Sequence, residues 1–474
     1  MSADALVLKD AAAMAEAVRS GAVSAVALAQ ASLDRIAATD GRVNAFTEVV
    51  RERALRRAAQ VDASLASPNA HRTRELPLLG VPFAVKNLFD IAGLPTLAGS
   101  KIERDSTPAR GDALLVHRLE SAGAVLVGAL NMDEYAYGFT TENSHVGPAH
   151  NPHDLARIAG GSSGGSGAAV AAGQVPLTLG SDTNGSIRVP ASLCGIFGLK
   201  PTFGRLPRTG SYPFISSLDH LGPFARSVRD LALAYDAMQG PETHAPRDPG
   251  CAQRAADPVA AQLSQGTRGL RIGVLGGYFR ERALPEALSA VDRVAEALGA
   301  HQTVELPMVE AGRAAAFLIT NAEGAALHLH DLRQRPQDFE PLSRDRFLAG
   351  ALIPAAWVAR AQRVRRLYAE QVGKLFERFD ILLAPSTPCA ATPIGAEWFE
   401  LNGQRLPVRP NMGVLTQPIS CIGLPVCAVP VWGAHASLPI GVQVIAAPWR
   451  EDLALRVAAA LEAANVVHSP VAAL

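Results

Sequence analysis

Two serine- and glycine-rich stretches lie close together in the sequence and restrict how this part of the chain folds. The first reads IAGGSSGGSGAAVAAG over residues 158–173, and the second reads LGSDTNGSIRVPASLCG over residues 179–195. Glycine permits positive backbone φ and close backbone approach, and small residues let a following helix pack tightly. The 24 residues from Ser162 to Ser186 are enough for a helix and a strand. Such a unit would return the second stretch to the side of the first, so that the two serines meet.

The first stretch alone permits three interpretations. It does not fit a phosphate-binding P-loop, because Ser166 stands where a lysine should follow the last glycine, and it does not match G-x-G-x-x-G. It formally matches the G-x-S-x-G nucleophile elbow around Ser162, although so small a pattern arises easily in a glycine-serine run. The third interpretation is a flexible loop without chemistry. The stretch by itself does not separate a catalytic loop from a structural one.

The second stretch favours catalysis. Thr183, Asn184 and Gly185 precede Ser186, where successive backbone N–H groups can converge on one point and bind an anion. An oxyanion hole requires this geometry. Asparagine tolerates positive φ better than most residues, so we expect the turn to form with Asn184 in it. Neither stretch contains a histidine, so a serine nucleophile here needs another base.

An apolar run upstream carries an unexpected lysine. The run LLGVPFAVKNLFD, bounded by Gly80, Pro82 and Asp90, is typical of a buried strand. Burial would disfavour the ammonium form of Lys86 and lower its pKa. The alternative is an ordinary lysine that reaches solvent from the end of a strand.

These three segments together resemble the amidase signature family. The resemblance rests on Lys86 in GVPFAVKN, Ser162 in GGSSGGSGAAVAAG and Ser186 in GSDTNGSIRVPASLCGIFGLKPT. It extends to NMDEYAYGFTTENSHVGP, SLDHLGPFARSVRD and APSTP, and so spans most of the chain. It implies an α/β fold, a single α/β/α domain whose large, twisted, mixed β-sheet is flanked by helices. It implies no metal and no organic cofactor.

The resemblance also implies a Ser–cisSer–Lys triad and an acyl-enzyme intermediate. Ser186 would attack the amide carbonyl, Ser162 would relay protons, and Lys86 would be the base. A lysine acts as a base only when neutral, and lowering its pKa from about 10.4 to about 7 requires roughly 4 to 5 kcal/mol of ammonium destabilisation. Backbone N–H groups of residues 183–186 would hold the oxyanion.

Further residues are assigned by the same resemblance. Asp182 and Arg188 resemble a pair that braces the oxyanion loop, and Ser163 resembles a residue that orients Ser162 by hydrogen bonding. A carboxylated substrate would also need a cation or several donors in the pocket. The candidates for that role, each with a structural role as its alternative, are Tyr135, Arg208, Tyr212 and His328.

Within the family, the stretches VPFAVKNLFDIAGLPTLAGSKI and SSLDHLGPFARS are most similar to the catalytic subunits of 1-carboxybiuret hydrolases. This similarity implies release of ammonia from a small, planar, anionic ureido acid, a step of cyanuric acid degradation. It also implies a small helical partner similar to the C subunit of glutamyl-tRNA amidotransferase. The expected assembly is a heterotetramer of two large and two small chains.

Two other kinds of function stay open. One is the glutaminase subunit of the A type in glutamyl-tRNA amidotransferase, or a general aliphatic amidase. Asn184 and Val189 depart from the GGSIRQPA form of that subunit. The other is a non-catalytic scaffold, which would have lost Lys86, Ser162 or Ser186, and all three are present.

We expect one amidase-signature domain over residues 1–474. Its parts are an N-terminal helical segment at about 1–75, a signature core at about 76–240, a surface excursion at about 241–268, and C-terminal strands and helices at 269–474. Helical patterns alternate with strand-like runs such as LRIGVLGG, FDILLAPS, LPVCAVPV and LPIGVQVIAAP. This alternation is typical of a sheet covered by helices.

Composition excludes several classes of protein. The 44 basic and 44 acidic side chains balance, so no strong field for nucleic acid is expected. No window offers the roughly 18 to 20 uncharged apolar residues that a membrane span requires. The five cysteines lack the spacing of a disulfide framework or a zinc site, which fits the reducing cytoplasm. We therefore expect a cytoplasmic enzyme without a membrane or nucleic-acid partner.

Overall fold

A computed structural model describes residues 2–68, 70–243, 246–433 and 437–474. Residues 1 and 69 of the expected N-terminal segment, 244–245 of the expected excursion and 434–436 of the C-terminal part lie outside the described residues.

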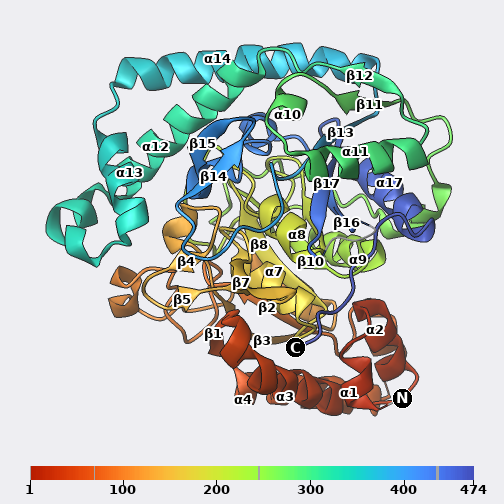
Figure 1. The fold of residues 1–474 in the computed structure, drawn as a ribbon. Helices are drawn as coiled ribbons and strands as arrows, with labels where there is room; N and C mark the ends of the chain where they lie inside the picture. Colours follow the sequence, from red (N-terminus) through yellow and green to blue (C-terminus); the bar gives the residue numbers. More distant parts are fainter. Residues whose placement is uncertain (1, 69, 244–245, 434–436) are drawn as a thin grey trace.

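A large mixed sheet organises the described part of the chain (Figure 1). Its eleven strands follow the spatial order β1 (Phe46–Val49), β3 (Val125–Leu130), β2 (Pro82–Lys86), β8 (Leu177–Asp182), β10 (His220–Ala225), β9 (Phe197–Lys200), β16 (Val426–Val431), β17 (Ile440–Ala446), β13 (Ile381–Pro385), β11 (Ile272–Leu275) and β12 (Gln302–Val304). Neighbours are parallel in β3–β2–β8 and in β13–β11–β12, and antiparallel elsewhere. The expected α/β fold with a mixed sheet is confirmed.

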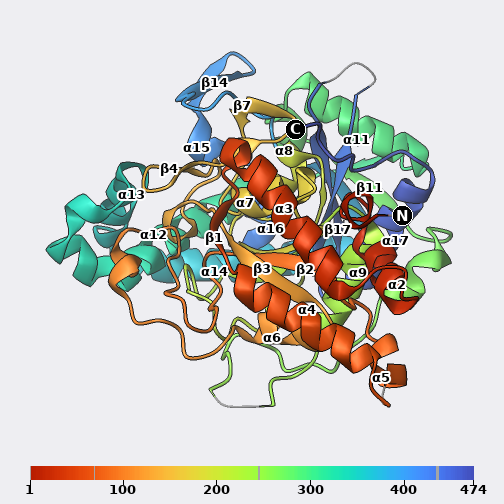
Figure 2. The ribbon, with the colours of Figure 1, turned by 90° about the horizontal axis from the view of Figure 1, so that it is seen from below.

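Helices flank this sheet, as expected. They are α1 (Ala3–Leu6), α2 (Ala11–Arg19), α3 (Ala25–Val43), α4 (Arg51–Leu65), α5 (Ala70–Arg74), α6 (Leu114–Ser121), α7 (Gly164–Ala171), α8 (Arg188–Cys194), α9 (Val228–Met238), α10 (Tyr278–Glu281), α11 (Pro285–Ala297), α12 (Val309–Gln334), α13 (Pro341–Ala351), α14 (Ala355–Gly373), α15 (Val408–Asn411), α16 (Gln417–Cys421) and α17 (Glu451–Ala463). Helices α3 and α4 lie across strands β2 and β3 (Figure 2), and α12, α13 and α14 pack together at the far side of the molecule (Figure 1).

Three short hairpins complete the described elements. They pair β4 (Glu142–Asn143) with β5 (Gly147–Pro148), β6 (His150–Asn151) with β7 (Asp154–Ile158), and β14 (Trp398–Leu401) with β15 (Gln404–Pro407). Within its described residues, the expected excursion at 241–268 contains one 3₁₀ turn (Ala260–Gln265) and otherwise irregular chain. No helix in the described part of the chain is both long enough and apolar enough to cross a membrane.

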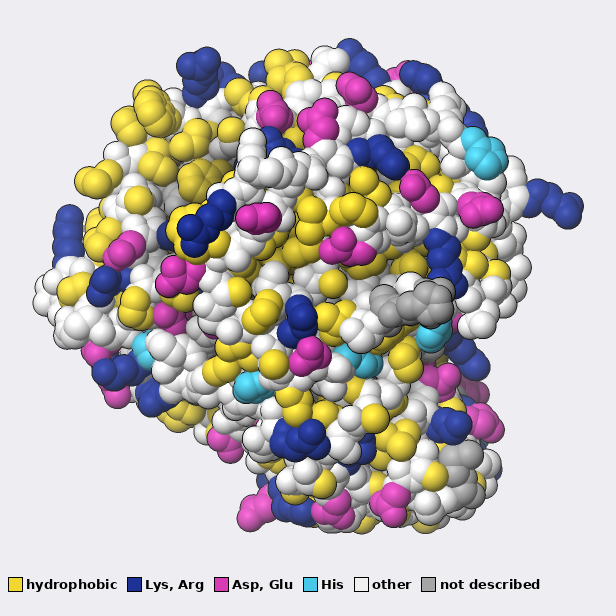
Figure 3. Space-filling model, viewed as in Figure 1, with side chains coloured by type: hydrophobic (Ala, Val, Ile, Leu, Met, Phe, Trp, Pro, Cys, Tyr) yellow, Lys and Arg dark blue, Asp and Glu magenta, His cyan; other side chains and the backbone are white. Residues whose placement is uncertain are grey.

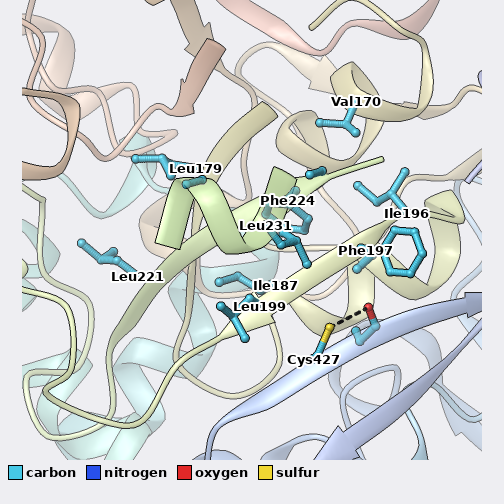
Figure 4. Packing of buried hydrophobic residues seen from close by; sticks show 14 of the residues in the cluster. Val170, Leu179, Ile187, Ile196, Phe197, Leu199, Leu221, Phe224, Leu231 and Cys427 are labelled. Carbon is cyan, nitrogen blue, oxygen red and sulfur yellow. Dashed lines mark hydrogen bonds between the residues drawn. The ribbon is translucent and has the colours of Figure 1, made fainter. Parts of the chain in front are cut away.

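The core lies where the central strands meet the flanking helices. Every residue of β2, β8, β9 and β10 is buried, as in a sheet that is covered on both faces. Figure 4 shows Leu179 of β8, Leu199 of β9 and Phe224 of β10 in this core with Leu231 of α9. The strands that carry the serine and lysine segments are therefore held on both faces.

The expected N-terminal helical segment also contains a strand. Residues Phe46–Val49 form β1, which pairs antiparallel with β3 at the edge of the sheet. Only Phe46 of this strand is buried, so the apolar alternation that marks a longer strand is missing. The N-terminal segment is thus mainly helical, with this one short strand in it.

Candidate active site

The sheet brings the lysine and the two serines to one edge. Lys86 is the last residue of β2, which runs parallel to β8 with Val85 opposite Leu179. The carboxyl ends of parallel neighbours lie at the same edge of a sheet. Ser162 lies in the loop that enters α7, and Ser186 lies in the loop that leaves β8.

Lys86 connects the two neighbouring segments through hydrogen bonds. Its Nζ donates to Ser162 Oγ over 2.7 Å and to Ser181 Oγ over 2.9 Å. The peptide bond between Gly161 and Ser162 is cis, and both Lys86 and Ser162 are completely buried. The geometry places a potential base in direct contact with the hydroxyl of Ser162.

The surroundings of Lys86 keep much of it uncharged near neutrality. Burial lowers the pKa of Lys86 from 10.5 to about 7, although the carboxylates of Asp133, Asp219 and Asp182 oppose the shift. A shift of this size corresponds to about 5 kcal/mol of ammonium destabilisation. A neutral lysine amine can accept a proton from a serine hydroxyl, whereas the ammonium form cannot.

Glycine is required at two positions around the serines. A Cβ at Gly161 would collide with the carboxylate of Asp133, so no side chain fits before Ser162. Gly185 has φ of 143°, and a Cβ there would collide with the hydroxyl of Thr416. The positive φ of the second loop therefore falls on Gly185, and the turn forms with Asn184 in it.

The loop over residues 183–186 is fixed from outside, and its amides remain available. Among the described residues, no acceptor is hydrogen-bonded to these four backbone N–H groups. The Thr416 hydroxyl donates to the backbone carbonyl of Asn184 over 2.7 Å, and Asn184 Nδ2 donates to Thr320 Oγ1 over 2.9 Å. Free, fixed amides beside Ser186 are suited to hold an oxyanion.

Asp182 and Arg188 form a buried ion pair behind this loop. Arg188 donates from Nη2 to Asp182 Oδ1 over 2.9 Å and from Nε to Oδ2 over 3.0 Å, and both side chains are inaccessible. Burial alone would raise the pKa of Asp182, but Arg188 holds it well below its ordinary value. Asp182 Oδ2 also accepts from the backbone amide of Ile187 over 3.2 Å. The pair thus anchors both ends of the loop that presents Ser186.

Replacing Asp182 with asparagine should strongly destabilise the protein. The substitution keeps the shape but leaves the Arg188 charge buried without compensation, which costs about 3 to 5 kcal/mol. We expect a large fall in the urea unfolding midpoint. Asp345→Asn is the matched control, because Asp345 pairs with Arg344 at the surface and should change the midpoint little. Equal effects of the two substitutions would contradict the bracing role of Asp182.

Ser163 contacts Ser181 rather than the neighbour that it was expected to orient. Ser163 Oγ donates to the Ser181 carbonyl over 3.1 Å and accepts from the Ser181 amide over 3.3 Å. Ser181 in turn accepts the second hydrogen bond of Lys86. Ser163 therefore positions Lys86 through Ser181, a residue that the sequence did not single out. In the sequence, nothing marks Ser181 except its position in the strand that precedes Ser186.

Ser186 opens on a small cavity. The residues that line it are Ala136, Tyr137, Gly138, Phe139, Thr183, Asn184, Ser186, Phe214, Phe317, Thr320, Arg346 and Gln417. Arg346 is the one charged residue in this lining, and its guanidinium lies 3.7 Å from the centre of the Tyr137 ring. The oxygen Oδ1 of Asn184 is buried and without a hydrogen-bond partner among the described residues. The cavity thus combines Ser186 with a cation and a free acceptor.

The four residues expected to bind an anionic substrate do not line this cavity. Tyr135 and Tyr212 donate their hydroxyls to Glu103 Oε1 over 3.2 and 2.8 Å, and the Tyr135 ring lies 3.9 Å from that of His328. Arg208 forms a bidentate ion pair with Asp248 over 2.7 and 2.8 Å.

These contacts give the four residues packing and pairing roles, and Arg346 is the charged residue that lines the cavity. The segment LSRDRFL that contains Arg346 resembles a solvated helix in the sequence, and nothing in it marks this arginine.

Comparison with known proteins agrees with this fold. The family model described as amidase matches residues 27–455. The chain is 61% identical over 455 residues to AtzE of Pseudomonas sp. (strain ADP), a component of 1-carboxybiuret hydrolase, covering 96% of this chain and 98% of the relative. It is 39% identical to the A-type component of the glutamyl-tRNA(Gln) amidotransferase of Roseiflexus sp. (strain RS-1), covering 96% of both.

Solved structures show the same similarity. A structure described as a vestigial protein complex of an s-triazine catabolic enzyme superposes with a TM-score of 0.94 at 59% identity, covering 97% of this chain and 100% of the other. A bacterial aryl acylamidase of the amidase signature family superposes with a TM-score of 0.86 at 28% identity, covering 97% of each chain.

Proposed function

Since the chain belongs to the amidase family and is therefore a hydrolase of amide C–N bonds, we propose that it removes ammonia from a small anionic ureido acid such as 1-carboxybiuret. The observation that carries this proposal is the cavity, where Arg346 and the free oxygen of Asn184 lie in the same lining as Ser186. The relative that is 61% identical is named for hydrolysis of 1-carboxybiuret, which supports the same substrate.

The proposed reaction starts from the contact between Lys86 and Ser162. Ser162, hydrogen-bonded to neutral Lys86, accepts the proton of Ser186 while passing its own to the amine. Ser186 Oγ forms a bond to the carbonyl carbon, and the oxyanion is held by the amides of residues 183–186. The C–N bond then breaks, Ser162 returns a proton to the departing nitrogen, and ammonia leaves. Water repeats these transfers to release the acid from Ser186.

The two polar groups of the lining match the two ends of a ureido acid. The Arg346 guanidinium can pair with the carboxylate, since arginine recognises planar carboxylates with two parallel donors. Asn184 Oδ1 can accept an N–H of the ureido group, because an amide oxygen is an acceptor only. Asn184 is buried and Arg346 is half-buried, and a substrate that engages them offsets the desolvation cost of these groups.

The residues that line the cavity disfavour glutamine and neutral aliphatic amides, the substrates of the two alternative enzymes. Glutamine carries an α-ammonium group, and none of the described residues that line the cavity is acidic. A neutral aliphatic amide would leave Arg346 without a partner at the wall of the cavity. A glutaminase or a general aliphatic amidase is therefore a weaker proposal than a ureido-acid hydrolase.

Ammonia release from 1-carboxybiuret, biuret and glutamine tests the proposal. Biuret is the matched substrate, because it keeps the ureido groups and lacks the carboxylate. We expect 1-carboxybiuret to have the highest kcat/KM and Arg346→Ala to raise its KM about 10- to 100-fold, as loss of a charge-assisted hydrogen bond predicts. The KM for biuret should hardly change in the same variant.

Arg344→Ala is the control for this experiment, since Arg344 lies two residues away on α13 and pairs with Asp345 at the surface. A preference for glutamine, or an equal effect of Arg346→Ala on both ureido substrates, would contradict the proposed substrate class.

We propose further that the chain works in the cytoplasm as one component of a heterotetramer, with a small helical partner. Support comes from the relatives, which are named as subunits of a hydrolase and of an amidotransferase. Copurification of the chain with that partner, followed by sizing of the complex, tests the assembly.

A further inference from the structure

A long apolar segment lies exposed at the junction of α13 and α14. Residues 348–359 read LAGALIPAAWVA and contain no charged side chain. Leu352 is 83% exposed and Trp357 is 58% exposed, and Leu348 is exposed as well. Figure 3 shows hydrophobic side chains gathered over this part of the surface, where α12, α13 and α14 lie in Figure 1. An apolar surface of this kind marks an interaction site more often than a free surface.

A groove between α12 and α14 continues this surface. Its volume is about 340 Å³, and its lining is Ala311, Ala314, Ala315, Leu318, Trp357, Arg360, Ala361 and Val364. Ala315 and Ala361 are buried, whereas Trp357 is the most exposed of the large apolar residues in the lining. Two buried alanines at the base and the exposed Trp357 at the edge form a surface that can accept the apolar face of a helix.

The charges beside the groove are positive. Arg360 in the lining and Arg363 one turn further along α14 are not buried, and neither lies within ion-pair distance of a carboxylate among the described residues. Arg366 on the next turn meets Glu370 only at 3.8 Å. A second copy of this chain would present the same arginines, whereas an acidic helix would pair with them.

We propose that this groove is the docking site of an acidic amphipathic helix from a partner chain. The inference rests on the helical partner proposed above and names the surface and the chemistry by which that partner binds. Large apolar side chains at helical spacing would fill the alanine-lined floor beside Trp357, and glutamates or aspartates on the flank would face Arg360 and Arg363.

The groove and the catalytic cavity share one helix. On α12, Leu318 lies in the groove, and its neighbour Phe317, 48% exposed, lies in the lining of the cavity. Thr320 on the same helix accepts the hydrogen bond of Asn184 in the oxyanion loop. A helix bound in the groove would therefore restrain α12, and through it the cavity wall, without supplying a group to the reaction.

A designed peptide tests the groove on the full chain. The probe is a fluorescent helical peptide of about 20 residues with leucines at helical i, i+3 and i+7 spacing and glutamates on both flanks, and its comparison has lysines in place of the glutamates. We expect the acidic peptide to bind at least about tenfold more tightly than the basic one. Hydrogen exchange should show protection confined to α12 and α14.

Trp357→Glu should weaken binding of the acidic peptide at least about tenfold, because it places a negative charge in the apolar groove. Trp398→Glu is the matched control, since Trp398 on β14 is 46% exposed and remote from this groove. The double substitution Arg360→Glu with Arg363→Glu should reverse the preference between the two peptides.

Three results would overturn the proposal: no binding of the acidic peptide, equal binding of both peptides, or sedimentation as a dimer that Trp357→Glu dissociates. Ammonia release by the Trp357→Glu chain alone should equal that of the unaltered chain. Failure of docking is thereby separated from failure of the proposed hydrolysis.

Discussion

Ser186→Ala is expected to lower kcat for amide hydrolysis by about ten-thousand-fold or more. The substitution removes the only hydroxyl in the described cavity lining that is both free to attack and beside the oxyanion loop. Thr183 Oγ1 already donates to Asp219 over 2.6 Å, and Thr320 Oγ1 accepts from Asn184, so neither replaces it. Losing a serine nucleophile removes the covalent path and leaves only residual binding and electrostatic effects.

Substrate binding should survive this change, because Arg346 and Asn184 are untouched. Single-turnover ammonia release, combined with a direct measurement of substrate binding, separates the two effects. Ser192→Ala is the control, since Ser192 is also buried on the adjoining helix α8 but bonds Thr387 over 2.8 Å, away from the cavity. A folded Ser186→Ala protein with more than about one-hundredth of the original kcat would contradict the nucleophile assignment.

Lys86→Met should have the second largest effect, with kcat lowered about a thousandfold. Methionine keeps an unbranched chain in the buried site and removes the base. In the unaltered enzyme, kcat/KM should rise with pH to a plateau with an apparent pKa of about 7, because only the neutral amine accepts a proton. Below that pKa, kcat/KM should fall about tenfold per pH unit, and the Lys86→Met variant should lose this dependence on pH.

Lys200→Met is the matched control for the pH profile. Lys200 is a second completely buried lysine, on β9, and its Nζ donates to the Pro201 carbonyl rather than to a serine. The Lys200→Met variant should keep the fall of kcat/KM below about pH 7. An unchanged fall in Lys86→Met, or its disappearance in Lys200→Met alone, would show that another group is the base.

The same lysine affects stability in a defined pH window. The pKa of Lys86 is lower in the folded chain than the ordinary 10.5, so the unfolded chain binds more protons between about pH 7 and 10.5. The destabilisation from burying Lys86 is therefore complete below about pH 7 and fades as pH rises through this window. The same burial that destabilises the folded chain also favours the neutral amine, which is the form of Lys86 that the proposed reaction requires.

Much of the fold was predictable because the central strands are buried on both faces. The stretches around Phe83, Leu179 and Val444 are mostly apolar, with few polar residues, and each is a strand. The edge strand at Phe46 was missed, since its existence depends on pairing with β3 and not on a pattern of its own. Its other three residues are half-buried or exposed, so they carry no apolar signal.

The candidate site was predictable only where a local motif presents it. Ser162 and Ser186 lie in glycine-containing loops that the sequence marks, and Lys86 interrupts a strand. Ser181 and Arg346 reach the site through strand register and through packing of α13 against α12, neither of which leaves a local pattern. The sequence does not assign a role to Tyr135, because an aromatic residue near a signature motif serves core packing and substrate contact equally well.

Labelling by a serine-directed fluorophosphonate, located by peptide mass spectrometry, tests the central claim most directly. We expect one modified residue, Ser186, with a labelling rate that rises with pH to a plateau with an apparent pKa of about 7. The rate should collapse in Lys86→Met and persist in Lys200→Met. Turnover of amide substrate by a protein whose Ser186 is never labelled, or labelling that is indifferent to Lys86, would contradict the claim that Lys86 activates Ser186 through Ser162.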